Sequence, residues 1–338
     1  MILVDGSLGE GGGQVLRTSL ALALVTGKPF RIVNIRAGRK QPGLLRQHLT
    51  AVRAAAEVGG GRVTGDALRS CELAFEPGPV RPGRYEFAVG TAGSATLVFQ
   101  TVLPALATAP GPSELVLRGG THNPWAPPLD FLQQAFLPVL ARMGPEVTVN
   151  LVRPGFYPAG GGEFHVSIRP AALAPLVLLE RGEVLSRRAR ALVAGLPAHI
   201  AERELKVVRG KLGWPPEALV FEPIDGTFGP GNVLMLEIRC EHVTEVFTGF
   251  GQLNVRAETV AARAVDEARR WLASGVPVGE HLADQLLVPL ALAGGKFRTV
   301  RPSGHAETNL AVIRQFVDVD ASCTEIGCDV WEVEVQPA

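Results

Sequence analysis

The sequence predicts an α/β fold made of three copies of one supersecondary unit, with a smaller α/β domain inserted before the third copy. Turns that contain glycine, at residues 5–13, 90–94 and 279–281, each lead into an apolar helical segment. A strand, a second turn, another helix and a pair of short strands complete each unit. The spacing between the second and third copies is much longer than the others. We therefore expect the first two units in 1–182, the insert in 183–275 and the third unit in 276–338.

The first unit opens with an apolar strand over residues 1–4, a turn with five glycines and a helix over 14–25. Glycine lets backbone N–H groups approach a ligand closely, and a helix N-terminus favours anions. The turn fits neither the G-x-G-x-x-G fingerprint nor a Walker loop. Two explanations stay open: the glycines cradle a ligand, or they only relieve a tight corner. Glu10, inside the turn, is a candidate to hold a metal or polarise a ligand hydroxyl.

The remaining elements follow from apolar periodicity and turn residues. The first unit continues with a strand over 30–35 and a helix over 43–58, the second has a helix over 95–109 and a strand over 114–118, and the third has a helix over 282–293 and a strand over 297–300. In the insert we expect strands at 189–195, 219–222, 233–239 and 243–250 and helices at 198–212 and 255–274. The insert contains no catalytic constellation that the sequence reveals.

The charges balance at 33 basic and 33 acidic residues, so no net field draws the protein to nucleic acid or to a membrane. A polyanion site must therefore be local. One window of 23 residues lacks any acid and contains Arg31, Arg36, Arg39, Lys40, Arg46 and Arg53. Such a run is either a solvated face or a contact for phosphates.

The location of the protein is predicted from what the sequence lacks. Four cysteines without C-x-x-C spacing indicate reduced thiols, not a zinc site or a disulfide framework. The chain opens with a strand and glycines in place of a signal peptide, and its apolar runs are too short to span a bilayer. We expect a soluble cytoplasmic protein without a membrane contact.

His305 is the leading candidate among seven histidines. It follows Ser303-Gly304 and begins a helix, where the positive end of the helix dipole favours the neutral imidazole. A neutral ring nitrogen can attack phosphorus. Thr308 and Asn309, one turn later, could orient the ring or bind a phosphate. The alternative is a helix-capping turn with an incidental histidine.

Polar residues interrupt otherwise apolar helices in all three units. His281, Asp284 and Gln285 share one helix face, Gln14 and Arg17 are one turn apart, and Gln100 stands within an apolar run. A glutamine buried without a partner would cost a few kcal/mol, roughly 1–3 on mutational scales. These groups are therefore expected to line one shared pocket.

Five motifs carry a resemblance to a known family. They are the opening segment 5–17; Ile-Arg-Ala-Gly-Arg-x-x-Pro-Gly-Leu-x-x-Gln-His at 35–48; Gly-Phe-Tyr-Pro-Ala-Gly-Gly-Gly at 155–162; Gly-Glu-x-Leu-Ala-Asp-Gln at 279–285; and His-x-x-Thr-Asn at 305–309. In this order, along essentially the whole chain, they resemble the RNA 3′-terminal phosphate cyclases. The resemblance implies three βαβαββ repeats and one small inserted domain.

The resemblance also implies a reaction. Members of the family use ATP and a divalent metal, Mg²⁺ or Mn²⁺, to convert an RNA 3′-phosphate end to a 2′,3′-cyclic phosphate, and they release AMP and pyrophosphate. His305 would form a covalent histidine–AMP, the AMP would pass to the RNA 3′-phosphate, and the ribose 2′-OH would then expel it. RNA 3′-phosphate ends are the implied partner, and no protein partner is evident.

Individual roles follow from the matching motif positions. Glu10 would be the metal ligand beside the ATP phosphates, and Arg36 and Arg39 would bind phosphates of ATP or of the RNA end, as would Arg17. The other implied ATP contacts are Gln14, Gln100, Asp284, Gln285 and Pro127 or Pro128, which would pack on the adenine. The chain has His281 where a tyrosine is expected in the family, so the contact to the base is expected to differ.

Two other functions are compatible with parts of this sequence. A non-catalytic cyclase-like factor for RNA processing would share the fold but lack the nucleophile, which His305 argues against. An enolpyruvyl transferase would share the repeated architecture, but its chemistry requires neither a histidine nucleophile nor the glycine-rich opening.

Overall fold

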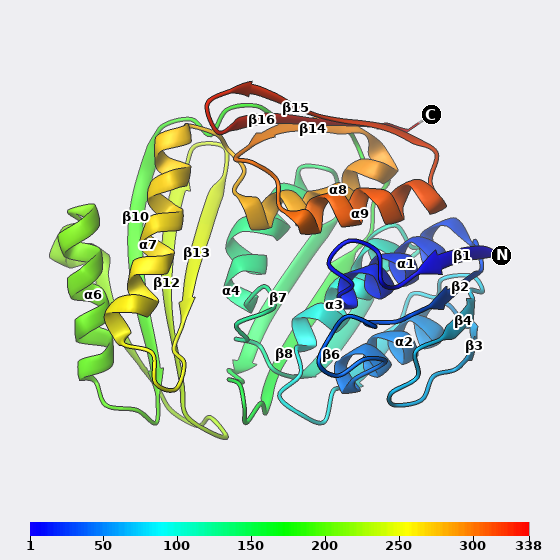
Figure 1. Cartoon of the computed structure of the whole chain (residues 1–338), viewed down its shortest axis with the longest axis horizontal. Helices are drawn as coiled ribbons and strands as arrows, with labels where there is room; N and C mark the ends of the chain where they lie inside the picture. The colour runs from blue at the N-terminus through cyan, green and yellow to red at the C-terminus, as the bar shows by residue number, and fades with distance from the viewer. Residues whose placement is uncertain (338) are drawn as a thin grey trace.

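The computed structural model describes residues 1–337 and contains four mixed sheets of four strands each, with helices between them (Figure 1). The first sheet has the order β1-β2-β4-β3, in which β1 and β2 are parallel and β4 is antiparallel to both its neighbours. Its elements are β1 (Ile2–Asp5), α1 (Gly13–Thr26), β2 (Phe30–Val33), α2 (Arg46–Val58), β3 (Arg62–Thr64) and β4 (Leu73–Glu76).

Two further sheets have the same strand order and the same strand directions. The elements of the first of these sheets and of its connecting helices are β5 (Arg84–Ala88), α3 (Ala95–Ala107), β6 (Ser113–Gly119), α4 (Leu129–Phe131), η1 (Leu132–Phe136), α5 (Leu137–Ala141), β7 (Glu146–Arg153) and β8 (Gly162–Arg169). The elements of the second sheet and of its connecting helices are β9 (Leu176–Leu178), α8 (Glu280–Ala293), β14 (Gly295–Thr299), α9 (Gly304–Phe316), β15 (Val319–Gly327) and β16 (Val330–Pro337). The predicted α/β class is confirmed.

The fourth sheet, β11-β10-β12-β13, lies in the chain between β9 and α8. Its elements are β10 (Val184–Ala194), α6 (His199–Leu212), η2 (Pro216–Ala218), β11 (Leu219–Ile224), β12 (Gly231–Cys240), β13 (Thr244–Phe250) and α7 (Ala257–Ser274). Helices α6 and α7 cover its outer face (Figure 1). These elements fall within the range expected for the insert, whose boundaries at 183 and 275 stay a prediction.

Several helix starts differ by a few residues from the sequence expectation, and the largest difference is in α2. Helix α2 begins at Arg46 and not at residue 43, because Gly43 has a φ of +75° and a Cβ there would overlap the carbonyl of Arg69. Helix α8 begins at Glu280, before the apolar run at 282–293, and it includes His281 as the shared face with Asp284 and Gln285 predicts.

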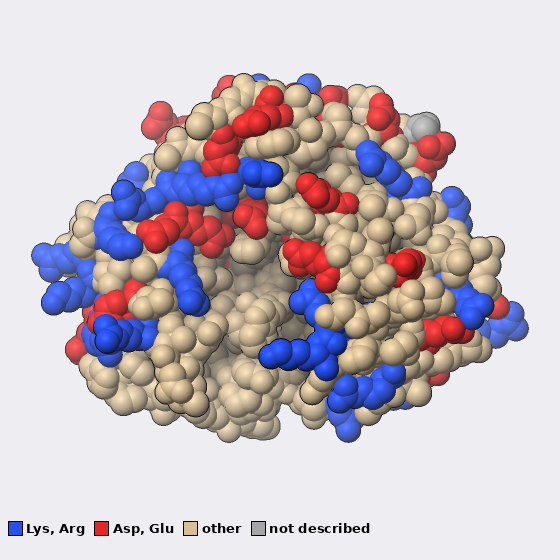
Figure 2. All heavy atoms as spheres, viewed as in Figure 1, with Lys and Arg blue, Asp and Glu red and all other residues tan. Residues whose placement is uncertain are grey.

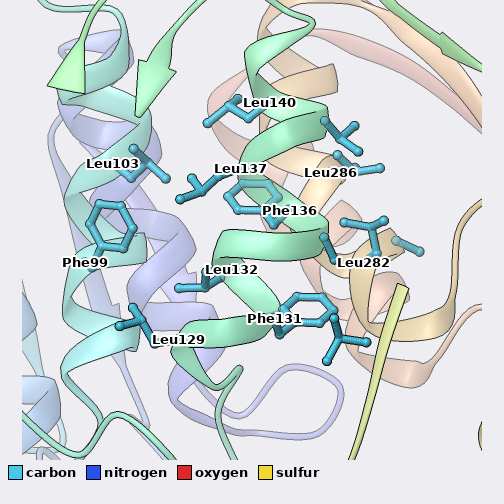
Figure 3. Packing of buried hydrophobic residues seen from close by; sticks show 14 of the residues in the cluster. Phe99, Leu103, Leu129, Phe131, Leu132, Phe136, Leu137, Leu140, Leu282 and Leu286 are labelled. Carbon is cyan, nitrogen blue, oxygen red and sulfur yellow. The ribbon is translucent and has the colours of Figure 1, made fainter. Parts of the chain in front are cut away.

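The helices pack together in the centre, with the sheets outside. Phe99 and Leu103 of α3 face Leu132 and Leu137, while Leu282 of α8 lies on the opposite side (Figure 3). These side chains are at most 5% exposed, and each stabilises the fold by about 1.5–3 kcal/mol. No helix of residues 1–337 is long and apolar enough to cross a membrane.

The π-helical segment η1 has a local cause. Pro138 has no N–H to donate to the carbonyl of Gln134, so the α-helical hydrogen-bond ladder is broken at this point. The N–H of Leu137 donates to the carbonyl of Leu132, five residues earlier, as in a π-helix. This turn lies in the packed centre of the molecule (Figure 3).

Candidate active site

The N-terminal ends of six helices meet in the region where the sequence places its candidate residues. Contacts join α9 to α1 through His305 and Gln14, α1 to α2 through Gly13 and His48, and α2 to α3 through Gln47 and Ser94. The same region takes in α4 through Thr96, whose hydroxyl donates to the carbonyl of Pro127, and α8 through Asp284 and Ser303. Because each N-terminus carries positive partial charge, this convergence favours a polyanion.

His305 lies at the start of α9 between two side chains of the first unit. Its Nε2 is 3.0 Å from Oε2 of Glu10, and its Nδ1 is 3.1 Å from Oε1 of Gln14. The side chains of His305 and Glu10 are 46% and 44% exposed, so a ligand can reach both. The imidazole is thus held at both nitrogens yet remains open to solvent.

A neutral imidazole donates from one nitrogen only, so the contacts to Gln14 and to Glu10 belong to different tautomers. If Nδ1–H donates to the Gln14 oxygen, Nε2 carries the lone pair and faces the same space as the Glu10 carboxylate. A carboxylate beside an incoming phosphate would repel it unless a cation lies between them. The arrangement therefore suits an Nε2 nucleophile with a cation bound at Glu10.

The glycine turn before α1 packs tightly against α9. Gly9 has a φ of +56°, and a Cβ there would overlap Oγ1 of Thr308. The hydroxyl of Thr308 donates to the carbonyl of Gly304 at 2.7 Å. Gly9 therefore allows the close approach that positions Glu10 against His305.

Replacing Gly9 with alanine is expected to lower the free energy of unfolding by about 1–3 kcal/mol, because the left-handed backbone and the overlap with Thr308 both become costly. Chemical denaturation measures this loss. Gly38→Ala is the matched control, since a Cβ at Gly38 meets nothing within 4 Å. Equal stability of the two variants would contradict the packing described.

Asp284, in the second turn of α8, connects this helix to the start of α9. Its Oδ1 accepts a hydrogen bond of 3.2 Å from the hydroxyl of Ser303, the N-cap of α9, and its backbone carbonyl accepts from Asn309. Burial raises the pKa of Asp284 to about 7; the Ser303 bond and His281 oppose that rise, and Glu280 and Glu10 add to it. Near neutral pH the protonated and the ionised forms of the Asp284 carboxyl are therefore both populated.

The raised pKa of Asp284 predicts a specific pH dependence of stability. Below about pH 4 the folded and unfolded states both hold the proton; between about 4 and 7 only the folded state does, so stability falls as pH rises. Asp284→Asn removes this contribution. Between pH 4 and pH 8 the free energy of unfolding of the variant, relative to that of the wild type, should therefore rise by up to about 4 kcal/mol. Denaturation across this range measures the difference. The exposed control Asp318→Asn should give a flat difference, and the prediction is wrong if Asp284→Asn does too.

Arg17 on α1 is a half-buried cation with no carboxylate partner among residues 1–337. Burial, with the charge of Arg36, lowers the pKa of Arg17 to about 10. The neighbouring His48 is buried, and its Nδ1 accepts a 3.1 Å hydrogen bond from the N–H of Leu45. Burial and the two arginines lower the pKa of His48 to about 3, so it stays neutral. An unpaired, half-buried guanidinium is typical of an anion site.

The basic loop after β2 lies beside these residues. Nη1 of Arg36 donates to the carbonyls of Gln41 and Gly43, so Arg36 orders its own loop. Nη2 of Arg39 donates to the carbonyl of Glu10 at 3.2 Å and lies 3.8 Å from the Glu10 carboxylate. Figure 2 shows basic and acidic side chains along one wall of a hollow that separates the repeats from the fourth sheet.

The structure also shows the surroundings of the other residues that the sequence predicts to contact ATP. Gln100 of α3 and Gln285 of α8 are hydrogen-bonded through their side-chain amides. His281 is exposed, with Nε2 3.4 Å from a carboxylate oxygen of Glu267 on α7. Pro127 is half-buried, and Pro128 is buried as the residue before α4. The roles assigned to these residues stay predictions.

No group of three or more His, Cys, Asp or Glu side chains in residues 1–337 is placed to hold a metal. Glu10 is the carboxylate that lies beside His305. Mg²⁺ is commonly bound by one or two carboxylates together with substrate phosphates, so one exposed carboxylate beside an anion site fits such an ion.

Comparisons with known proteins identify the family. The family model described as RNA 3′-terminal phosphate cyclase matches residues 8–323. The chain belongs to this family. A protein of this name from Pseudomonas fluorescens is 56% identical over 335 residues, which cover 99% of this chain and 97% of that protein. One from Ectopseudomonas mendocina is 54% identical over 99% of this chain and 98% of that protein, and one from Salmonella typhimurium is 51% identical over 97% of each.

A solved EPSP synthase structure from Acinetobacter baumannii aligns with 99% of this chain and 64% of that chain. Its TM-score is 0.29 at 10% identity, which is too low to support any conclusion about this family member.

Several residues of this family member act in the site in ways that the sequence did not indicate. Ser303 bonds Asp284, and Gln47 accepts from the N–H of Ser94, the N-cap of α3. Asn309 joins α9 to α1, because its Oδ1 accepts a hydrogen bond of 2.7 Å from the hydroxyl of Thr18. The expected roles of Thr308 and Asn309 toward the ring or a phosphate stay predictions. The Gln-His pair within the motif at 35–48 was the available signal for Gln47 and His48.

Proposed function

We propose that this chain uses ATP to convert an RNA 3′-phosphate end to a 2′,3′-cyclic phosphate and that it releases AMP and pyrophosphate. The observation that carries the proposal is the imidazole of His305, held between Glu10 and Gln14 where helix N-termini converge. Membership of the cyclase family supplies the substrate class.

In the first step Nε2 of His305 attacks the α-phosphorus of ATP. An N–P bond forms, the bond from the α-phosphorus to the bridging oxygen breaks, and pyrophosphate leaves with the electron pair. Gln14 keeps the proton on Nδ1 and so leaves the Nε2 lone pair free for the attack. Arg17 and the converging N-termini oppose the negative charge of the phosphates.

In the second step an oxygen of the RNA 3′-phosphate attacks the same phosphorus and breaks the N–P bond, which returns the neutral imidazole. The resulting RNA(3′)pp(5′)A has a good leaving group where the bare phosphate had none. The ribose 2′-oxygen then attacks the terminal RNA phosphorus, loses its proton to solvent and expels AMP. Atoms and charges balance, with one ATP consumed per cyclic end.

We infer that Glu10 holds a divalent cation, Mg²⁺ or Mn²⁺, together with phosphate oxygens of the substrate. Such a cation supplies charge neutralisation at the transferring phosphoryl group. Arg36, Arg39, Gln100, Pro127, His281, Asp284 and Gln285 are the remaining proposed contacts to the nucleotide and to the RNA end.

Product analysis tests this function. A 3′-phosphorylated RNA oligonucleotide with ATP and Mg²⁺ should become resistant to phosphatase, and AMP should appear in equal amount. Phosphate release with phosphoenolpyruvate as the donor would instead indicate an enolpyruvyl transferase. RNA binding without AMP release would indicate a non-catalytic RNA-processing factor.

A further inference from the structure

Three large aromatic side chains are exposed on three loops at one edge of the hollow. Trp125 is 77% exposed, Tyr157 is 56% exposed and Phe228 is 67% exposed. They come from the loops 120–128, 154–161 and 225–230, which follow β6, β7 and β11. Apolar rings of this size are normally buried, so their common exposure indicates a binding surface.

The three loops form one continuous surface, which we call the aromatic rim. The rings of Trp125 and Tyr157 contact edge to face, with centroids 5.8 Å apart and an interplanar angle of 79°. Four residues after Tyr157, a Cβ at Gly161 would overlap the ring of Phe228. The loops after β7 and β11 lie side by side at the lower edge of Figure 1. Apolar and uncharged side chains dominate this edge in Figure 2.

The aromatic rim is joined to the candidate active site by the turn at 90–94. A Cβ at Gly160 would meet Cα of Ala92 at 2.7 Å, and the side-chain amide of Asn123 donates to the Ala92 carbonyl at 2.6 Å. At the other end of the same turn, the N–H of Ser94 donates to Gln47, the neighbour of His48. Packed contacts thus connect the rim to helix α2, which follows the basic loop.

A cation lies within the rim. Cζ of Arg153 is 4.5 Å from the centroid of the Phe228 ring, and its Nε donates to the carbonyl of Gly161 at 2.7 Å. No carboxylate in residues 1–337 lies within ion-pair distance of Arg153. Exposed rings beside a free guanidinium suit a ligand with flat π-faces and negative charge.

We propose that the aromatic rim binds the single-stranded RNA that precedes the terminal phosphate, with bases stacked on Trp125, Tyr157 and Phe228. Stacking accepts every base, because each base has a π-face, so the rim selects unpaired strands without reading their sequence. This inference rests on the proposed function for the identity of the ligand. The inference concerns the nucleotides that precede the terminal phosphate, which His305 does not contact.

Equilibrium binding without ATP tests the rim separately from catalysis. The probes are a 3′-phosphorylated RNA of ten nucleotides and a 3′-phosphorylated dinucleotide. Trp125→Ala and Phe228→Ala should each raise the Kd of the longer RNA about tenfold, with the dinucleotide Kd unchanged. Phe221→Ala, at an exposed aromatic on β11, is the matched control and should change neither.

The remaining outcomes separate the two proposals. If the wild type cyclises RNA and the rim variants bind the longer RNA as it does, the rim inference is wrong and the proposed function stands. Loss of self-association in Trp125→Ala, with RNA affinity unchanged, would make the rim a contact for a second copy and would overturn the inference. If the wild type binds neither probe, both proposals fail. Unaltered labelling of the variants by ATP would exclude misfolding.

Discussion

Replacing His305 with asparagine is expected to lower cyclisation of RNA ends by at least about 10⁴-fold. Asparagine has no basic nitrogen that can attack phosphorus, so the covalent route is lost and not merely slowed. The side chain is half-exposed, and we expect the variant to fold with nearly unchanged stability. Single-turnover assays with excess enzyme and a 3′-phosphorylated RNA measure the loss.

The chain offers a matched control for this substitution. His199 is also exposed at the start of a helix, α6, but it lies on the outer face of the fourth sheet. His199→Asn should keep full activity. Comparable activity of His305→Asn and the wild type would contradict the assignment of the nucleophile.

Replacing Arg17 with methionine is expected to have the second largest effect, a loss of about 10²–10³-fold in kcat/KM. Among residues 1–337 the Arg17 guanidinium has no carboxylate partner, and the positive charge of Arg36 repels it, so its partial burial serves a ligand and not the fold. Methionine retains the apolar stem but cannot stabilise a phosphate. The same change should raise stability, because a buried unpaired charge is removed.

Activity and stability should thus move in opposite directions for Arg17→Met. Enzyme kinetics and denaturation of the same preparation measure both, with Arg209→Met on the exposed face of α6 as the control. A variant that is less stable and fully active would make Arg17 a structural residue.

The sequence allowed the class of the fold to be predicted because periodicity and glycine turns are local properties. The places where boundaries differ have local causes that are invisible without coordinates. The left-handed backbone of Gly43, for example, delays the start of α2.

The candidate site could be predicted only as a set of residues and not as an arrangement. Gln14 and His305 are 291 positions apart, so nothing local indicates that one holds the other. The environment of Arg17 likewise depends on the buried His48 of α2, which is distant in sequence and lies near Arg17 only in the folded chain. The aromatic rim also joins three loops distant in sequence, and single aromatic residues gave no signal of it.

Transfer of label from ATP to the protein tests the central claim most directly. The wild type and His305→Asn are incubated with ATP labelled at the α-phosphate and with Mg²⁺, then denatured and digested. We predict an acid-labile, alkali-stable label on the peptide that contains His305, in the wild type alone. Absence of label from wild-type protein that binds ATP, or label on a peptide without His305, would contradict the account.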